Sequence, residues 1–593
     1  MSTDPTPTPP PFGRRPARRI RPTRRTRRTQ AGAVTAAPPA VTAAGPTVTA
    51  ALAAAAEVAA AVAALGAGEL VAALTGPDTA PVLAVGSAAI DLTPTPLKEY
   101  AVRTFGTSDK TVLLGGIHLT MALLAALAGL LAARRPAVGA GVFALFGGLG
   151  AWAALSRPGA GPADAAPALV AGLVGAATVR WLTRRLRAAT ATGPEAASGP
   201  EAAPEAGPDA AAAPVTAPAT AADAAVPAEE PPAPQGPGRR SVLAATGGTI
   251  AVGALAGVVG RTLSDRRYDV TAARDAVRVP PAARPLPPLP VPVHPKVSGL
   301  SPFVTPTADF YRVDTALTLP RIDPRRWALR IRGMVDHPLL LTFDDLLHEP
   351  LEELDHTLTC VSNEVGGPYV GTTRWLGASL PALLRRAGVR PGADQLVGRS
   401  QDGMTIGTPL ESVLDGRRAL LAVAMDGEAL PVAHGFPCRS VVPGFYGYTS
   451  ATKWLVDLDV TTFAAFDPYW VRRGWDRTGE VRTASRIEVP APFARVRAGD
   501  VAVAGTAWAT HRGIAAVEVR VDGGPWQEAL LAADAGPDLW RQWTHTWTGA
   551  TPGTHRIEVR ATDATGAVQT EERAAPFPSG ATGWHSTVVT VTS

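Results

Sequence analysis

The sequence predicts three structural classes along one chain: an N-terminal α-helical membrane region, an α+β domain and a C-terminal all-β sandwich. Three observations lead to this prediction. The first 290 residues are dominated by alanine and contain several apolar stretches of bilayer-spanning length. Most of the tryptophans follow residue 296, where strand and helix patterns alternate. After Pro490, short alternating strands are separated by glycine and aspartate turns.

Composition and charge restrict the class of protein. The 593 residues include 58 prolines and 59 glycines, which is not the composition of one soluble globule. The net charge of +5 is small for this length, so the sequence gives no reason to expect a nucleic-acid partner. The basic run between Arg14 and Arg28 lies in a tail, 1–46, that we expect to be disordered, cytosolic and close to a membrane.

Hydropathy predicts a four-helix transmembrane region over 47–187 and one further helix, with spans at 48–74, 111–133, 137–156, 166–182 and 242–262. The basic clusters determine the expected orientation. If the clusters at 14–28, 134–135 and 180–187 are all cytoplasmic, the first four spans form a path with both ends inside. The loop 77–110 then faces outward, and its apolar piece 80–90 is too short to cross, so it could be re-entrant.

The chain then returns to the membrane once. Residues 188–238 are rich in Ala, Pro and Glu, which predicts a disordered linker. In 239–262, paired Arg239 and Arg240 precede an apolar run, a pattern typical of a twin-arginine export signal or of an ordinary fifth helix. Both interpretations place the rest of the chain outside the cytoplasm, after a Pro-rich tether at 263–295.

Two folded domains are predicted beyond the tether. Residues 296–489 combine strands with an amphipathic helix in which Leu380, Leu383 and Leu384 share one face, which indicates an α+β domain. Residues 490–593 predict a sandwich of short strands similar to an immunoglobulin domain, with a hairpin signal at 522–524. Its tryptophans are expected in the core and rim of the sandwich: Trp508, Trp526, Trp540, Trp543 and Trp547.

The chemistry centres on Cys360, one of only two cysteines. A thiolate is a soft ligand for a transition metal. His434, Arg439 and Lys453 are donors of the kind that hold a phosphorylated cofactor. Together they predict a metal-binding thiolate and an anion clamp in an oxidoreductase. Two simpler interpretations stay open: a disulfide between Cys360 and Cys438, and a purely structural His434.

Five segments give the chain a specific resemblance: DFYRVDT at 309–315, LTCVSNE at 358–364, HGFPCRSVVPG at 434–444, TKWL at 452–455 and GTAWATHRGIAAVEVRVDGGPW at 505–526. With them, residues 296–593 resemble the sulfite oxidase family of molybdopterin enzymes. The resemblance implies a sulfite-oxidase-like α+β molybdopterin domain followed by an immunoglobulin-like domain of the dimerisation type, so a homodimer is possible.

The same resemblance implies roles for individual residues. Cys360 would bind molybdenum (Mo), together with the dithiolene sulfurs of molybdopterin. The cofactor's pterin and phosphate would be held by a set of residues from both ends of the domain: Tyr311, Arg312, His434, Arg439, Ala451, Thr452 and Lys453. Arg512, from the second domain, would supply a catalytic cation to the substrate pocket. The implied reaction is oxygen-atom transfer on a small S-oxo or N-oxo compound, for which no Ser-His-Asp triad is needed.

The residues after Cys360 depart from the family pattern. Sulfite-oxidising members carry an arginine there, whereas this chain has Val361, Ser362, Asn363 and then Glu364. An acid in place of a cation opposes the binding of a dianionic substrate. One pair of unit charges about 4 Å apart interacts by about 4 kcal/mol at an effective dielectric constant near 20. A neutral sulfoxide or N-oxide is therefore an alternative to an oxo-anion, although Arg374 or Arg512 could restore the charge.

Electron transfer is expected to need a separate partner. The membrane region contains one histidine, His118, and Met121 follows it on the same helix, so a haem held from two sides is not expected there. We interpret His118 as a polar residue in a helix interface. A competing hypothesis is a non-catalytic, membrane-anchored binding protein whose cofactor domain is degenerate; it predicts no bound metal.

Overall fold

The computed structural model describes residues 46–94, 97, 100, 104–105, 109–132, 137–157, 160–191 and 239–593. The expected tail with Arg14–Arg28, the pair Arg134 and Arg135, and most of the linker 188–238 lie outside the described residues.

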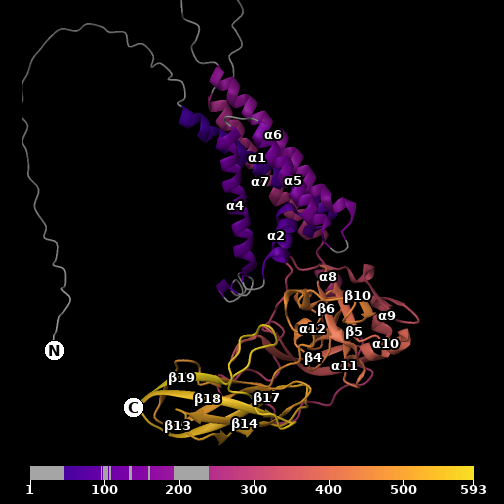
Figure 1. Cartoon of the computed structure of the whole chain (residues 1–593), viewed down its shortest axis with the longest axis vertical. Helices are drawn as coiled ribbons and strands as arrows, with labels where there is room; N and C mark the ends of the chain where they lie inside the picture. The colour runs from indigo at the N-terminus through magenta and orange to yellow at the C-terminus, as the bar shows by residue number, and fades with distance from the viewer. Residues whose placement is uncertain are drawn as a thin grey trace, which may run out of the picture. The chain divides into compact units, whose positions relative to one another are not determined.

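The N-terminal part is helical, with α1 (Pro46–Thr75), α2 (Pro81–Leu92), α4 (Asp109–Ala132), α5 (Ala137–Leu155), α6 (Ala166–Ala191) and α7 (Arg239–Arg267) (Figure 1). Within the described ranges, five helical stretches are long and apolar enough to cross a membrane: Ala50–Thr75, Lys110–Ala132, Ala137–Leu155, Pro162–Ala189 and Arg240–Asp275. They match the five predicted spans. Helix α2 has 12 residues and is the short apolar piece of the loop.

Small residues let these helices pack closely. A Cβ atom at Gly253 of α7 would lie 2.7 Å from the backbone of Ala63 in α1, and one at Gly129 of α4 would lie 2.6 Å from Ala54 Cα. Such contacts are possible only where both helices present small side chains. The interpretation of His118 as an interface residue is wrong: it lies on an exposed face of α4, with Nδ1 2.7 Å from the Leu114 carbonyl oxygen.

The α+β domain contains two sheets, with strand orders β2-β1-β10-β5-β6 and β3-β4-β7-β8, and β9 paired to β7. The strands of this domain are β1 (Ala328–Gly333), β2 (Leu339–Thr342), β3 (Leu351–Thr359), β4 (Val370–Ser379), β5 (Gln395–Ser400), β6 (Thr405–Pro409), β7 (Leu420–Met425), β8 (Glu428–Ala429), β9 (Arg439–Val441) and β10 (Leu455–Thr461). Its helices are α8 (Thr271–Asp275), α9 (Phe343–His348), α10 (Leu380–Ala387), α11 (Leu410–Leu414) and α12 (Gly447–Ser450).

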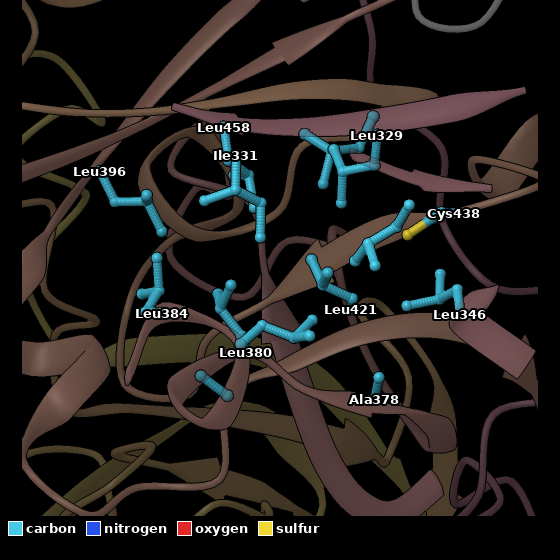
Figure 2. Packing of buried hydrophobic residues seen from close by; sticks show 14 of the residues in the cluster. Leu329, Ile331, Leu346, Ala378, Leu380, Leu384, Leu396, Leu421, Cys438 and Leu458 are labelled. Carbon is cyan, nitrogen blue, oxygen red and sulfur yellow. The ribbon is translucent and has the colours of Figure 1, made fainter. Parts of the chain in front are cut away.

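The core of this domain lies where α10 packs against both sheets (Figure 2). Leu380 and Leu384 of α10 are fully buried, as the amphipathic pattern predicts. They belong to one cluster with Ile331 of β1 and Leu421 of β7. Cys438 is part of the same apolar cluster, and both cysteines are free, so the disulfide alternative is wrong.

The C-terminal part is made of two sheets, β11-β13-β17-β16 and β12-β19-β18-β14-β15. Their strands are β11 (Ala484–Val489), β12 (Arg495–Arg497), β13 (Gly499–Trp508), β14 (Ile514–Val521), β15 (Gln527–Glu528), β16 (Leu530–Leu531), β17 (Arg541–Ala550), β18 (Gly553–Asp563) and β19 (His585–Thr592). Trp543 is fully buried in the cluster shared by both sheets, whereas Trp508 and Trp540 belong to a second cluster with Val361 and Tyr446 of the α+β domain.

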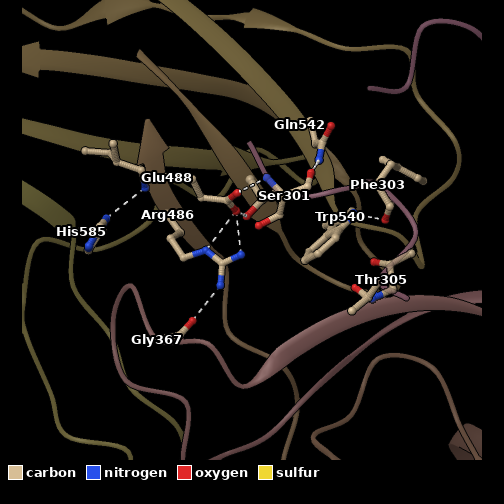
Figure 3. A network of polar contacts seen from close by, with 12 residues as sticks. Ser301, Phe303, Thr305, Gly367, Arg486, Glu488, Trp540, Gln542 and His585 are labelled. Carbon is tan, nitrogen blue, oxygen red and sulfur yellow. Dashed lines mark hydrogen bonds and ion pairs between the residues drawn. The ribbon is translucent and has the colours of Figure 1, made fainter. Parts of the chain in front are cut away.

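Polar contacts also join the two domains close to Cys360 (Figure 3). Arg486 of β11 donates from Nη1 to the Gly367 carbonyl oxygen at 2.9 Å and from Nη2 to Glu488 Oε1 at 2.6 Å. The Ser301 N–H donates to the other oxygen of Glu488 at 2.8 Å. The loop that follows Cys360 is therefore held in place from the β domain.

Candidate functional site

A cavity of about 700 Å³ lies in the α+β domain and brings together distant parts of the sequence. It is within the range of sites that bind a ligand of cofactor size. Its lining includes most of the predicted site residues and side chains from the helical region: Ile90, Leu97, Lys110, Leu113, Tyr311, Asp314, Cys360, Glu364, His434, Arg439, Ala451 and Lys453.

Cys360 follows the last residue of β3 and faces this cavity. Its N–H donates to the Tyr369 carbonyl oxygen at 3.0 Å, which fixes the turn that carries the sulfur. Burial raises the pKa of the Cys360 thiol, although Ser362 and Lys453 oppose the rise. A bound metal ion reverses this balance because a coordinated thiol is deprotonated.

Three basic side chains of the segment 434–453 face the same cavity. Arg439, at the start of β9, is 3% exposed; its Nη1 donates to the His434 carbonyl oxygen at 3.2 Å and its guanidinium lies 4.8 Å from the ring centre of Trp375. Burial lowers the pKa of Arg439 to about 10. Burial, together with the neighbouring cations Arg439 and Lys453, lowers the pKa of His434 to about 4.

Asp314 is the acidic partner of this group. It accepts hydrogen bonds from Lys453 Nζ at 2.8 Å, Arg312 Nε at 2.9 Å and Lys110 Nζ at 2.6 Å. Burial would raise the pKa of Asp314, but Lys453, Arg312 and Lys110 outweigh it and hold the pKa below its usual value. Burial lowers the pKa of Lys453 to about 8, because the pairing with Asp314 compensates it only in part.

The charges and orphaned donors fit an anionic cofactor. Arg439 Nε is buried and has no hydrogen-bond partner, and no carboxylate of the described residues forms an ion pair with this guanidinium. Among the described residues, the ion pairs of Lys453, Arg312 and Lys110 converge on Asp314. Buried cations in excess of buried acids are stabilised by an anionic ligand, and a phosphate monoester brings about two negative charges.

The remaining predicted cofactor residues are distributed around the cavity. Tyr311 lines it and stacks on Phe310 with ring centres 5.4 Å apart; burial raises the pKa of Tyr311. Ala451 also lines it. Thr452 is buried, and its N–H donates to Ser440 Oγ at 2.9 Å. Arg312 reaches the site through its ion pair with Asp314.

The two arginines considered for the substrate are engaged elsewhere. Arg512 Nε donates to Asp563 Oδ2 at 2.9 Å, and its Nη2 donates to the Val481 carbonyl oxygen at 2.9 Å. Arg374 Nε donates to Asp355 Oδ1 at 2.7 Å. Neither arginine is among the described residues that line the cavity, whereas Glu364 does line it.

Sequence reasoning missed two kinds of site residue. Asp314 lies inside the DFYRVDT segment, so its pairing with Lys453 could have been suspected from the motif. Lys110 and Leu113, near the start of α4, carry no such signal, because the sequence assigns Lys110 only to an outward-facing loop and Leu113 only to a predicted span.

Comparison with known proteins agrees with this geometry. The family model described as an oxidoreductase molybdopterin binding domain matches residues 316–470. The uncharacterized oxidoreductase YuiH of Bacillus subtilis is 34% identical over 158 residues, which cover 27% of this chain and 76% of that protein. Mouse mitochondrial sulfite oxidase is 32% identical over 277 residues, 39% of this chain and 50% of that protein.

The chain spans about half the length of the animal sulfite oxidases that it matches. Among solved structures, the sulfane dehydrogenase SoxCD from Paracoccus pantotrophus aligns with a TM-score of 0.43 and 24% identity, over 49% of this chain and 84% of that chain.

Proposed function

Since the chain belongs to the sulfite oxidase family of molybdopterin-dependent oxidoreductases, we propose that it transfers an oxygen atom to a small sulfur oxo-anion in a sulfite-oxidase-like reaction. One observation supports this best: Cys360 lines the same cavity as the buried Arg439, whose Nε has no hydrogen-bond partner among the described residues. The hypothesis of a non-catalytic binding protein gives no reason for a buried arginine that lacks an anion.

Each residue of the site has a proposed task. Cys360 would hold the metal through its sulfur, while His434, Arg439 and Lys453 would hold the pterin and phosphate. Asp314 keeps Lys453 in position, and Tyr311 closes the cavity beside Phe310. The molybdenum cofactor, when bound, supplies the two-electron chemistry and the oxygen transfer. The chain itself binds, orients and shields the reactants, so no protein nucleophile is required.

A second candidate is reduction of a neutral sulfoxide or N-oxide. It rests on the acid Glu364 in the cavity lining and on the engagement of Arg374 and Arg512 with Asp355 and Asp563. With these two cations held elsewhere, Glu364 disfavours a dianion. Arg512 would then act as a bridge between Asp563 and the Val481 carbonyl, and not as a substrate ligand.

The test compares both directions in the purified full-length chain. We expect sulfite-dependent reduction of ferricyanide, and a fall below about one hundredth of that rate in Cys360→Ser, because changing even residues behind a metal ligand costs 10- to 100-fold. Cys438→Ser is the matched control, since Cys438 lies in the apolar core. If the protein purified from molybdenum-replete cells is colourless and contains no metal, the proposed enzymatic function is wrong. Activity only in sulfoxide-dependent oxidation of a reduced dye would favour the second candidate.

We also propose a multi-pass membrane location with the catalytic domain outside the cytoplasm. The contacts between helices and catalytic domain support it. Lys110 and Asp91 lie at helix ends in the loop expected outside, and Arg157 follows the third span, which ends on the same side. Lys110 contacts Asp314, Asp91 contacts Tyr469 and Arg157 contacts the Asp402 carbonyl oxygen. If these ends lie outside, as the basic clusters predict, the catalytic domain that contacts them lies outside as well.

The finer domain assignments remain proposals of the same kind. We propose that the twin-arginine pair at 239–240 directs export and that 263–295 is the tether. The two C-terminal sheets, with one shared core, support an immunoglobulin-like sandwich at 490–593. Its homodimerisation would be seen as a doubled mass in light scattering of the purified protein.

A further inference from the structure

We propose that the cofactor cavity also admits a lipid-soluble quinone from the membrane side, so that the enzyme exchanges electrons directly with membrane quinones. This inference rests on the proposed function, since a quinone needs a redox centre to react with. The chemistry that would recognise it is an apolar, partly aromatic wall next to the cofactor, built in part from membrane helices.

The helical region forms part of the cavity wall. Ile90 at the end of α2, Leu97 beyond it and Leu113 in the first turn of α4 all line the cavity that contains Cys360. Helix α4 belongs to a stretch long and apolar enough to cross a membrane, from Lys110 to Ala132. A cavity bounded by the end of such a helix lies at the level where a quinone ring meets the membrane surface.

Charged contacts hold this wall against the catalytic domain. Lys110, three residues before Leu113, donates to Asp314 Oδ1 and to the Ala316 carbonyl oxygen, both at 2.6 Å. The Tyr469 hydroxyl donates to Asp91 Oδ1 at 3.0 Å, next to Ile90. The apolar residues of the helices are thus fixed at the cavity by ion pairs and hydrogen bonds on both α2 and α4.

The part of the lining that the catalytic domain supplies suits a neutral, flat ring. Trp470 and Trp475 from the catalytic domain line the cavity with ring centres 6.1 Å apart. Leu97 is 57% exposed and Val313 is 43% exposed although both line the cavity, so apolar side chains lie at its open side. An apolar ligand gains free energy by burying these side chains.

The electrons of the proposed reaction need an acceptor, and a quinone can take both of them. Oxidation of the substrate X takes its oxygen from water: X, water and quinone give XO and quinol. Two electrons and two protons pass from the substrate and water to the quinone. The first 293 residues contain a single histidine, His118, which is exposed on α4, so the membrane helices do not offer two histidines to a haem.

The test uses the full-length protein in nanodiscs, with sulfite as donor and either decylubiquinone or ferricyanide as acceptor. We expect decylubiquinone to be reduced. In Leu113→Trp, which fills the helical side of the cavity, we expect the ratio of the decylubiquinone rate to the ferricyanide rate to fall about tenfold, the equivalent of about 1.4 kcal/mol. Leu119→Trp is the matched control on the same helix, because Leu119 is 62% exposed and does not line the cavity; its ratio should not change.

A second readout does not depend on turnover. A photoreactive azidoquinone should label peptides that contain 110–117 or 470–475, and decylubiquinone should compete with it. Ferricyanide reduction without decylubiquinone reduction or labelling would overturn the quinone inference alone and would indicate a soluble acceptor. Absence of sulfite-dependent ferricyanide reduction would overturn the proposed function instead. If Leu113→Trp and Leu119→Trp show the same ratio of decylubiquinone rate to ferricyanide rate, the proposed quinone site is also wrong.

Discussion

The guanidinium of Arg439 lies in the protein interior, where its Nε has no hydrogen-bond partner among the described residues. It stacks on Trp375, and its pKa falls to about 10 because burial disfavours the charge. Transferring one charge from water into the protein interior costs several kcal/mol unless a partner of opposite charge compensates it. In this chain the compensation is expected from the cofactor, so Arg439 opposes folding until the cofactor binds.

Arg439→Met is therefore expected to have opposite effects on the two forms. The cofactor-free protein should gain about 1–4 kcal/mol of unfolding free energy, because an uncompensated buried charge is replaced by an apolar side chain of similar length. The same variant should lose molybdenum. Chemical denaturation of cofactor-free protein and metal analysis of protein from replete cells measure the two effects. Arg439→Lys keeps the charge, and a gain of stability in that variant would contradict the explanation.

His585 predicts a pH dependence that is separate from the cofactor site. Its Nδ1 accepts a hydrogen bond from the Ile487 N–H at 3.0 Å, and burial together with Arg486 and Arg573 lowers its pKa to about 4. Between pH 4 and the ordinary value of 6.5, the unfolded chain binds a proton that the folded protein does not. Stability therefore rises with pH across this window and is lost on acidification, by at most about 1.4 kcal/mol per pH unit.

His585→Phe should reduce this slope between pH 6.5 and 4 and leave the part due to His434 and His356, whose pKa is also lowered to about 4. It should lower stability at pH 7, because the Ile487 N–H loses its acceptor. Thermal unfolding of the variant and of the unchanged protein at several pH values measures the difference. Asp563 does not contribute to the slope in this window. Although it is buried, hydrogen bonds from Thr565 and Arg512 lower its pKa to about 2, so it titrates at lower pH. An unchanged slope would exclude His585 as the cause.

At the scale of single elements, the close approach of α1 and α7 depends on glycine. Gly253→Leu is expected to destabilise this helix pair by about 1–3 kcal/mol, because a side chain there meets the α1 backbone and forces the helices apart. Gly248→Leu is the control in the same helix, since a Cβ at Gly248 meets no atom within 4 Å. Unfolding of the purified protein in increasing SDS compares the two variants, and equal midpoints would contradict this packing.

Elements that the sequence predicts well are those with local signals. Helix α9 begins at a capping box in which Thr342 and Asp345 bond reciprocally, and α10 ends at Gly388 with a positive φ of 70°. The five helical stretches long and apolar enough to cross a membrane follow from hydropathy alone. The exposed position of His118 could not be predicted, because an apolar helix has no polar face to indicate which side meets its neighbours.

The same contrast applies to the site. Cys360, Arg439 and Lys453 carry motif signals, and they do line one cavity. Arg512 also sits in a matching segment, yet it pairs with Asp563, because its partner lies about fifty residues away on β18 and no local pattern reveals it. Leu113 reaches the cavity only through the packing of helices against the catalytic domain, which is a long-range property of the fold.

At the scale of the whole molecule, orientation in the membrane can be tested with few background cysteines, because Cys360 and Cys438 are both buried. Phe493→Cys in the β domain and Leu92→Cys at the end of α2 place a thiol at positions that are 80% and 74% exposed. We expect a membrane-impermeant maleimide to label both variants in intact cells. Arg184→Cys, in the basic cluster of α6, should be labelled only after the membrane is opened.

Contacts between the helix ends and the catalytic domain restrict the possible labelling patterns more than hydropathy does. The helix ends that carry Asp91 and Lys110 bond to the catalytic domain, so Leu92 and Phe493 have to lie on the same side of the membrane. Labelling of Phe493→Cys without Leu92→Cys would therefore contradict the docking of the helices, and with it the quinone site. Labelling of Arg184→Cys in intact cells would reverse the orientation but would leave that docking unaffected, because both sets of contacts would move together.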